Sequence, residues 1–313
     1  MSAQDTQTLP FGPEAIARAA ALIVAGRPVA IPTETVYGLA ARADDGEAVA
    51  AIYEAKGRPS FNPLIVHILS LEQAERIARF DDRARALAQR YWPGPLTLVL
   101  PLRADAGIAS LATAGLDTIA LRMPAHPAMR ALLEATGLPL AAPSANASGA
   151  ISPTRAEHVR ASLGGRIPLI VDAGPTALGL ESTIVRVTGD RVELLRPGPI
   201  TAEELGAAAP HDDGRITAPG QLASHYAPAK PLRLAAAEAQ GDEYLIGFGA
   251  VKGDNNMSPS ANLAEAAANL FDFLHKADAA PQPAIAVAPI PDQGLGAAIN
   301  DRLRRAAAPR SPS

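Results

Sequence analysis

The chain has 313 residues, of which 48% are hydrophobic, and it contains no cysteine. This length suits one large domain or two ordinary ones, and the apolar content excludes intrinsic disorder as the dominant state. The lack of cysteine excludes disulfides, thiolate metal sites and a thiol nucleophile. No apolar stretch of about 18 residues and no signal peptide is visible, so we expect a cytoplasmic protein that does not enter a membrane.

Charge is distributed unevenly along the chain. Residues 1–200 contain 19 Lys and Arg against 19 Asp and Glu, whereas residues 201–313 contain 9 against 13. A protein that binds nucleic acid over a large surface usually carries a basic excess, so bulk nucleic acid is not the predicted partner. Lys56 is the only lysine in the first 200 residues, where every other cation is an arginine.

Short apolar runs alternate with helical patterns through the first 200 residues. Pro13 opens a helix that ends before Gly26, and Asp45 is placed to cap a helix over Glu47–Lys56. Ser70 and the glutamine three residues later form a capping-box pattern. We predict helices over 127–135 and 155–163 and strands over 28–33, 64–68, 96–100, 118–122, 169–171, 183–187 and 192–195. This alternation predicts an α/β layer fold.

The pattern changes after residue 205. Residues 206–231 are rich in Pro, Gly and Asp, which is a linker composition. Beyond them the sequence predicts strand, helix, strand and helix over 244–248, 263–276, 285–288 and 295–307. We therefore predict a first domain over residues 1–205, a linker over 206–231 and a small α/β domain over 232–313.

Polar and small residues gather where predicted strands end. Residues 32–39, PTETVYGL, either line a pocket or form a turn that caps the next element. Residues 56–63, KGRPSFNP, place two cations around a glycine, a pattern that suits phosphate binding but also a helix C-terminus. Residues 140–149, LAAPSANASG, either let a ligand approach the backbone or form an ordinary loop. His67 ends an apolar strand, and it is either a hydrogen-bonded residue of the core or a residue that binds a ligand.

Arginines accompany these segments. Arg122 shares a predicted strand face with Thr118, and an inward arginine on an apolar strand needs a partner. Arg196 follows a predicted hairpin, where it either clamps an anion or lies at the surface. With Arg58 and Lys56 they predict an anionic ligand, such as a nucleotide, held in a cleft. The P-loop, dinucleotide and zinc-protease motifs are absent.

Seven segments complete the pattern. PTETVYGL, AIYEAKGRPSFNPLIVHI, WPGPLTLVL, TIALRMPAHP, APSANASG, ESTIV and LRPG follow one another between residues 12 and 200. Together they resemble the YrdC-like threonylcarbamoyl-AMP synthase family, and the linker segments APGQL and HYAP, at 218–222 and 225–228, resemble its long two-domain form. The resemblance implies a YrdC-like twisted mixed sheet flanked by helices, followed through a linker by a smaller Rossmann-like α/β domain.

The resemblance also implies a reaction. L-threonine, bicarbonate or CO2 and ATP give threonylcarbamoyl-AMP and pyrophosphate, a nucleotidyl transfer that begins threonylcarbamoyl-adenosine modification of tRNA. A separate tRNA threonylcarbamoyl transferase then uses the product. The carbamate oxygen attacks the α-phosphorus directly, so catalysis needs positioning and charge neutralisation rather than an enzyme nucleophile. Mg²⁺ is expected to accompany ATP, with no metal-ligating residues and no organic cofactor.

Motif positions assign residues to the two substrates. The residues expected at threonine are Thr35, His67, Arg122 and Ser182, with Arg122 against the carboxylate. The residues expected at ATP are Arg58, Asn62, Thr118, Ser144, Ser152, Arg196 and Tyr226. Lys56 and Arg58 are the expected catalytic residues beside the triphosphate, and the further wall residues are Tyr37 and Asn146. The linker around Tyr226 is expected to close over the pocket as a lid.

Three other interpretations fit part of the sequence. The fold also suits a double-stranded RNA binder, but the balanced charge of residues 1–200 speaks against more than a weak RNA contact. YrdC-like domains also occur in hydrogenase maturation proteins, whose acylphosphatase and zinc-finger-like regions this cysteine-free chain lacks. A short YrdC-like paralogue is disfavoured because this chain continues into a linker and a second domain.

Overall fold

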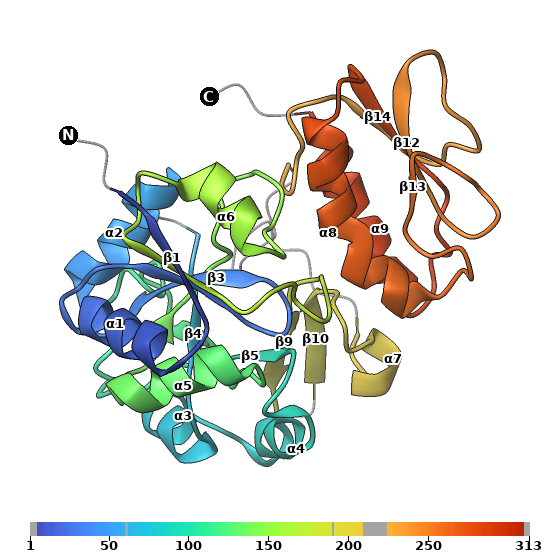
Figure 1. Cartoon of the computed structure of the whole chain (residues 1–313). Helices are drawn as coiled ribbons and strands as arrows, with labels where there is room; N and C mark the ends of the chain where they lie inside the picture. The colour runs from blue at the N-terminus through green and yellow to red at the C-terminus, as the bar shows by residue number, and fades with distance from the viewer. Residues whose placement is uncertain (1–4, 60–61, 190, 209–223, 310–313) are drawn as a thin grey trace.

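The computed structural model describes residues 5–59, 62–189, 191–208 and 224–309. Figure 1 shows a large unit, coloured blue to yellow, beside a small one, coloured orange to red. The strands of the two units form two separate sheets, of ten and four strands. The predicted α/β class, with a large mixed sheet and a smaller α/β unit, is confirmed. The predicted domain boundaries stay a prediction.

The large sheet joins strands that are far apart in the sequence. Its order is β1-β8-β2-β3-β7-β4-β6-β5-β9-β10, with both parallel and antiparallel neighbours. The strands are β1 (Gln7–Pro10), β2 (Val29–Pro32), β3 (Tyr37–Arg42), β4 (Ile65–His67), β5 (Leu96–Pro101), β6 (Thr118–Arg122), β7 (Leu140–Ala141), β8 (Leu169–Asp172), β9 (Thr183–Thr188) and β10 (Arg191–Arg196). The helices are α1 (Pro13–Val24), α2 (Gly46–Lys56), α3 (Leu71–Ile77), α4 (Asp82–Tyr91), α5 (Pro127–Thr136), α6 (Ala156–Leu163) and α7 (Ala202–Leu205).

Side chains of the central strands alternate between two apolar layers. Val29 and Ile31 of β2 pack with α1 and α5, whereas Ala30 between them packs with α2 and α6 on the other face. The period-two alternation of a strand produces this division, so both faces of the sheet are covered by helices. Because helices cover both faces of the sheet, the site is formed by the strand ends and the loops that connect them.

Two helix starts confirm the predicted capping chemistry. The Asp45 carboxylate accepts hydrogen bonds from the first turn of α2, and the Ser70 hydroxyl accepts one from the backbone of Gln73 in α3. The reciprocal half of the capping box differs, because the Gln73 side chain accepts from the Leu69 backbone instead. Each cap satisfies a backbone N–H that the helix itself leaves without a partner.

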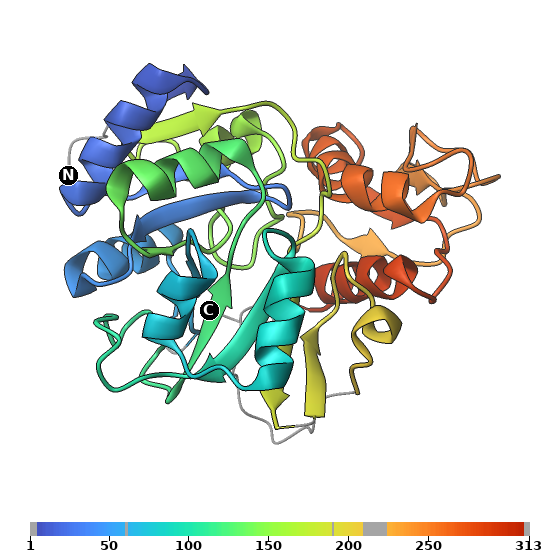
Figure 2. The ribbon, with the colours of Figure 1, turned by 90° about the horizontal axis from the view of Figure 1, so that it is seen from below.

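The small unit is built on four parallel strands. They are β11 (Leu232–Arg233), β12 (Glu243–Gly247), β13 (Asn255–Asn256) and β14 (Ala284–Val287), in the order β11-β14-β12-β13. Its helices are α8 (Leu263–Ala279) and α9 (Leu295–Ala307). Figures 1 and 2 show α8 and α9 on the side of this unit that faces the large one. The small unit therefore meets the large one through helices rather than through a sheet edge.

The contact between the units is close and polar. Asp272 of α8 accepts from Arg155 at 2.8 Å, and the rings of His158 in α6 and His275 in α8 stack with centroids 3.8 Å apart. Gly179 lies against the backbone of α8, where an added Cβ would come within 2.4 Å of the Ala267 carbonyl oxygen. Only glycine allows the two backbones to come so close, so this contact fixes the position of the small unit against the large one.

Parts of the structure lie outside the sequence predictions. The strands β1, β3, β11 and β13 and the helices α4 and α7 were not predicted. Of the segment 32–39, predicted to line a pocket or form a turn, residues 33–36 connect β2 to β3, and Tyr37 begins β3. Asp190, between the two strands of the predicted hairpin, and the APGQL segment at 218–222 lie outside the described residues. Within the described part of the chain, no helix is both long enough and apolar enough to span a membrane.

Candidate active site

A cavity opens where strand ends and loops of the large sheet meet the segment that precedes the small unit. It encloses about 540 Å³, including space open to solvent. Its walls come from the β2–β3 turn, the exits of β4, β6 and β7, the start of β9, the end of β10 and the segment before β11. The lining residues are Thr33, Thr35, Val36, Gly38, Arg58, Ile65, His67, Arg122, Ala142, Pro143, Ser144, Glu181, Ser182, Arg196, His225 and Tyr226.

One end of the cavity is organised by Arg122. Its guanidinium donates to the Thr35 hydroxyl at 2.9 Å and to the Gly94 carbonyl at 3.2 Å, and it pairs with the Glu34 carboxylate at 2.7 Å. Burial raises the pKa of Glu34, but the charge of Arg122 outweighs this effect, so the net pKa is lowered. The pair stays ionised, and an arginine fixed by three partners presents a constant positive charge to a ligand.

His67 stands beside Arg122 because β4 and β6 are parallel neighbours with these two residues in register. Burial, with the nearby Arg122 charge, lowers the pKa of His67 to about 3. Its imidazole is therefore neutral near pH 7 and acts as a hydrogen-bonding group rather than a cation. Its Nδ1 atom is buried without a hydrogen-bond partner among the described residues, so it is available to a ligand.

The opposite wall is held by Ser182 and Arg196. The Arg196 guanidinium donates to the Ser182 carbonyl at 2.9 Å and to its hydroxyl at 3.1 Å. The Ser182 hydroxyl also shares a 2.7 Å hydrogen bond with the hydroxyl of Thr97 in β5. These contacts tie the start of β9 to the end of β10, and they hold a buried arginine at the cavity wall.

Arg58 comes from the loop after α2, which ends in a left-handed glycine cap. Its guanidinium donates to the Pro63 carbonyl at 3.0 Å, and burial lowers its pKa to about 10, so it remains charged at neutral pH. One cavity is therefore lined by Arg58, Arg122 and Arg196, although 138 positions separate Arg58 from Arg196 in the sequence. Three guanidinium groups around one opening favour a polyanionic ligand.

Tyr226 forms a wall of the cavity from the segment that leads into the small unit. Its ring is buried, and its φ of 63° is unusual for a residue with a side chain. The conformation is held on both sides, because the His225 N–H donates to the Arg305 carbonyl and the Ala227 N–H donates to the Gly149 carbonyl. The Tyr226 hydroxyl has no hydrogen-bond partner among the described residues, so a ligand can supply one.

Comparison with known proteins identifies the family. A family model described as telomere recombination, Sua5_yciO_yrdC, matches residues 21–198, and one described as the threonylcarbamoyl-AMP synthase C-terminal domain matches residues 200–308. The threonylcarbamoyl-AMP synthase of Bacillus subtilis is 43% identical over 94% of this chain and 93% of its own. The chain belongs to the threonylcarbamoyl-AMP synthase family.

Solved structures of this synthase family agree. The crystal structure of Pyrococcus abyssi Sua5 complexed with L-threonine is 39% identical and superposes with a TM-score of 0.87, covering 96% of this chain and 97% of that one. The curated P. abyssi synthase is 40% identical over 92% of both chains. The likeness extends over both units, so the resemblance deduced from the sequence motifs is confirmed for the whole described architecture.

Most of the residues that the synthase motifs predicted come together. Eight of the predicted site residues line the cavity, and they are Thr35, Arg58, His67, Arg122, Ser144, Ser182, Arg196 and Tyr226. They come from eight different strand ends or loops, so only the fold brings them within reach of one ligand. Their assignment to particular substrates stays a prediction.

The predicted catalytic residue Lys56 does not line the cavity. It is 2% exposed, and its amine donates to the backbone carbonyls of Ser144, at 2.6 Å, and Asn146, at 2.5 Å. Burial and the charge of Arg58 lower the pKa of this amine well below its usual value. In this structure Lys56 holds the loop that carries Ser144, and it does not reach the ligand space itself.

Three predicted ATP residues are not among those that line the cavity, and their assignment to ATP stays a prediction. Thr118 sits four residues, about 13 Å, from Arg122 at the opposite end of β6. Asn62 is buried, and only its backbone carbonyl contacts Arg58. Ser152 is buried behind the wall, where its hydroxyl bonds the Glu181 carboxylate.

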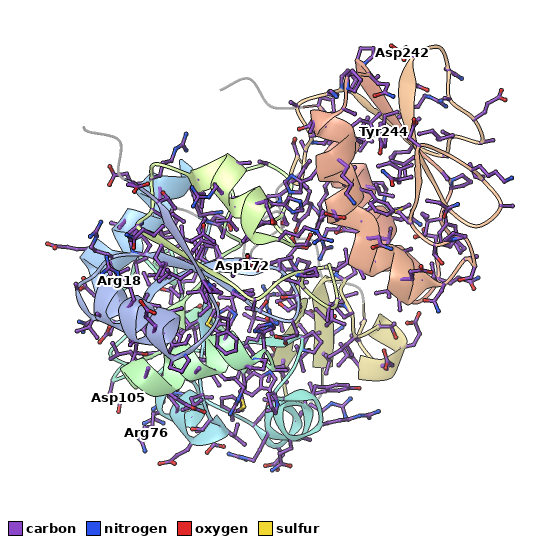
Figure 3. All side chains as sticks on the ribbon, in the orientation of Figure 1. Arg18, Arg76, Asp105, Asp172, Asp242 and Tyr244 are labelled. Carbon is purple, nitrogen blue, oxygen red and sulfur yellow. The ribbon has the colours of Figure 1, made fainter. Side chains whose placement is uncertain are left out.

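The two predicted wall residues serve the scaffold instead. The Tyr37 hydroxyl donates to the Gly174 carbonyl at 2.7 Å and contacts Asp172, which Figure 3 labels at the end of β8. The Asn146 amide donates to the carbonyls of Ala147 and Ala150 within its own loop. Neither side chain lines the cavity.

Sequence reasoning missed three residues at or behind the wall. Glu181 and His225 line the cavity, and both stand directly before a predicted site residue in the chain. Arg302 of α9 lies behind Glu181 and Tyr226 and is fully buried. Adjacency to Ser182 and Tyr226 was a usable signal for the first two, whereas nothing local in α9 marks Arg302.

Proposed function

We propose that this chain makes threonylcarbamoyl-AMP from L-threonine, bicarbonate or CO2 and ATP, with release of pyrophosphate, as a nucleotidyltransferase that acts in tRNA modification. The observation that carries the proposal is one cavity lined by two kinds of group. A neutral histidine stands beside a fixed arginine, and two further arginines line the same cavity. Membership of the synthase family and the threonine complex of the Pyrococcus relative support it.

The end with Arg122 suits an amino acid. Its guanidinium provides the charge for the carboxylate, and the Thr35 hydroxyl and the free Nδ1 of His67 are hydrogen-bonding groups for the remaining polar atoms. A neutral His67 does not repel the ammonium group of threonine, which an imidazolium would do. This end therefore orients a small polar amino acid with its amine toward the middle of the cavity.

The reaction then requires no covalent intermediate on the protein. The threonine ammonium group releases one proton to solvent, and the resulting amine adds to CO2 and releases a second proton, which forms a carbamate. A carbamate oxygen then attacks the α-phosphorus of ATP, and the bond from that phosphorus to the bridging oxygen breaks to release pyrophosphate. Negative charge grows on the phosphate oxygens, where Arg58 and Arg196 line the same cavity. Fixed positive charges that need no rearrangement stabilise such a transition state.

We further propose that Mg²⁺ arrives as part of the ATP co-substrate. In the described part of the chain, no group of three or more His, Asp or Glu side chains is arranged to hold a metal ion. The Glu181 carboxylate at the cavity already bonds Ser152 and Arg302. The donor set of the cavity thus suits an ion that is coordinated mainly by phosphate oxygens and water.

The test is an assay with labelled bicarbonate, ATP and a panel of amino acids, in which labelled adenylates are separated by chromatography. We expect label to enter an adenylate only when threonine is present, with one pyrophosphate released for each product. Arg196→Met removes a cavity charge and is the site variant, and Arg76→Met, which replaces a highly exposed arginine labelled in Figure 3, is the matched control. Label incorporation with every amino acid, or with none, refutes the proposal.

The product would pass to a separate tRNA threonylcarbamoyl transferase, and that partner and a cytoplasmic location stay predictions. A direct RNA contact is tested in the same preparation by filter binding across a salt series. RNA binding that falls steeply with salt, together with no adenylate formation, would favour the RNA-binding interpretation over the enzyme.

A further inference from the structure

Arg302 of α9 is the charged side chain by which the small unit reaches the wall of the cavity, beside Phe271 of α8, whose ring centroid lies 5.6 Å from that of Tyr226. It is fully buried, and every nitrogen of its guanidinium has a partner. Nε donates to the Glu181 carboxylate at 2.8 Å, one Nη donates to the Asp301 carboxylate at 2.6 Å, and the other donates to the Pro197 carbonyl at 2.9 Å. The guanidinium also lies over the Tyr226 ring, 5.2 Å from its centroid.

Three of these contacts fall on segments that build the cavity. Glu181 lines the cavity itself and directly precedes Ser182, and Pro197 directly follows Arg196. Tyr226 lines the cavity from the segment before β11. A single guanidinium therefore fixes the start of β9, the end of β10 and the aromatic wall with respect to one another. Planar donation from three nitrogens to three separate partners is specific to arginine.

The charge of Arg302 also keeps the Glu181 carboxylate ionised. One carboxylate oxygen of Glu181 bonds the Ser152 hydroxyl and the other bonds Arg302. Burial raises the pKa of Glu181, and the charges of Arg302 and then of Arg196 lower it, so that the net pKa is below its ordinary value. Glu181 is thus a buried carboxylate beside two arginines, one from each unit.

We propose that Arg302 is a positioning residue for the reaction, and that the small unit completes the active site by holding Glu181, Pro197 and Tyr226 through this one side chain. The inference rests on the proposed function and adds a purpose for the second unit. Without Arg302, the Glu181 carboxylate would keep its bond from Ser152 and would turn toward Arg196, a cation that lines the same cavity. Arg196 would then be drawn from its place against Ser182 at the cavity wall.

The test compares two arginines of the same helix. Arg302→Met removes the buried guanidinium and keeps most of its length, and Arg304→Met is the matched control because Arg304 is 59% exposed and has only a 3.6 Å contact with Asp292. Using the full chain, kcat and KM for ATP and threonine are measured with the labelled-bicarbonate assay, together with the unfolding temperature. We expect R302M to raise the KM for ATP by about tenfold or more, as removal of one partner from a buried charge pair does, and R304M to match the wild type.

A charge-compensation variant separates positioning from simple packing. In E181Q/R302M the carboxylate that would capture Arg196 is neutral, so we expect its KM for ATP to be about threefold or more below that of R302M. Loss of packing in α9 would not be relieved by a change in the other unit. Arg302→Lys keeps the charge but not the planar fork, and it is expected to fall between R302M and the wild type; it carries the comparison where R302M does not fold.

The outcomes are distinct from those that test the reaction itself. A wild-type chain that forms no threonylcarbamoyl-AMP refutes the proposed function. An active wild type with R302M equal to R304M in KM and kcat refutes the positioning by Arg302 and leaves the proposed function intact. A KM for R302M that E181Q does not lower also overturns it, because the effect then comes from packing alone.

Discussion

Gly198 offers a direct test of how tightly the cavity wall is built. It follows the Arg196-Pro197 pair, and a Cβ added there would lie 2.5 Å from the Thr183 nitrogen and 2.8 Å from the Glu181 oxygen. Ordinary contact begins at about 3.4 Å, so Gly198→Ala must push the backbone of the β9 start away by about 0.9 Å. All of the crowding atoms belong to the backbone, so no side-chain rotation relieves the clash.

The displacement acts on the stability of the fold and on the site together. Overpacking of this kind costs about 1–3 kcal/mol of the free energy of unfolding. It also moves Ser182 relative to Arg196, whose hydrogen bonds of 2.9 and 3.1 Å do not tolerate such a shift. A misplacement near 1 Å in a catalytic site can reduce the rate by about 100-fold, so we expect a loss of activity larger than the loss of stability explains.

Urea unfolding and pyrophosphate release measure the two effects. Gly46→Ala is the matched control, because Gly46 is the first residue of α2 and an added Cβ there meets nothing within 4 Å. That variant should unfold at the same or a slightly higher urea concentration, with an unchanged rate. A G198A chain with wild-type stability and wild-type pyrophosphate release would refute the close approach of the two backbone segments.

Other perturbations test contacts behind the cavity wall and between the two units. Lys56→Met removes the donor to the Ser144 and Asn146 carbonyls and should lower the free energy of unfolding by about 1–3 kcal/mol for each carbonyl. Because burial lowers the pKa of Lys56, the unfolded chain binds a proton there that the folded chain does not. Urea unfolding should therefore show that the stability difference between the wild type and Lys56→Met widens as pH rises toward 10.5. His158, whose pKa burial lowers to about 3, makes the fold less stable as pH falls from 6.5 toward 3, by at most about 1.4 kcal/mol at pH 5.5; His158→Asn should remove that part of the acid sensitivity, and an unchanged pH slope would contradict it. Gly179→Ala crowds the α8 backbone at 2.4 Å from a residue with a φ of 68°, so it should lower the unfolding temperature and slow adenylate formation; a wild-type rate would show that the site does not depend on the seating of the small unit.

The elements that sequence predicted well are those with local signals. The helix over 295–307 and the Asp45 cap appear as predicted, because apolar spacing and a capping carboxylate are properties of a few consecutive residues. The strand β3 was missed because Thr, Glu and Gly around Tyr37 are typical of a turn. In the structure these residues pair with β2 in an antiparallel hairpin, and the other edge of β3 pairs with β7, about a hundred positions away.

The site was predictable from motifs and only partly from chemistry. Arg58, Arg122 and Arg196 were expected to share a ligand, and the fold brings them to one cavity. Thr118 does not line that cavity, because period-two alternation gives the face of a strand but not the end at which a cavity opens, and its assignment to ATP stays a prediction. Arg302 has the local surroundings of an exposed helical arginine, and its burial depends on a partner, Glu181, 121 residues earlier in the chain.

The position of Arg302 in the chain has a consequence during synthesis. When the ribosome has completed β10, every strand of the large sheet and most of the cavity wall exist, but the counter-charge of Glu181 is still more than a hundred codons away. A nascent chain at that stage can fold the large sheet, but it lacks the Arg302 side chain that holds Glu181 at the cavity wall. On this proposal, tight use of ATP would be reached only after α9 has emerged, and an unfinished polypeptide would make the reactive mixed anhydride less readily.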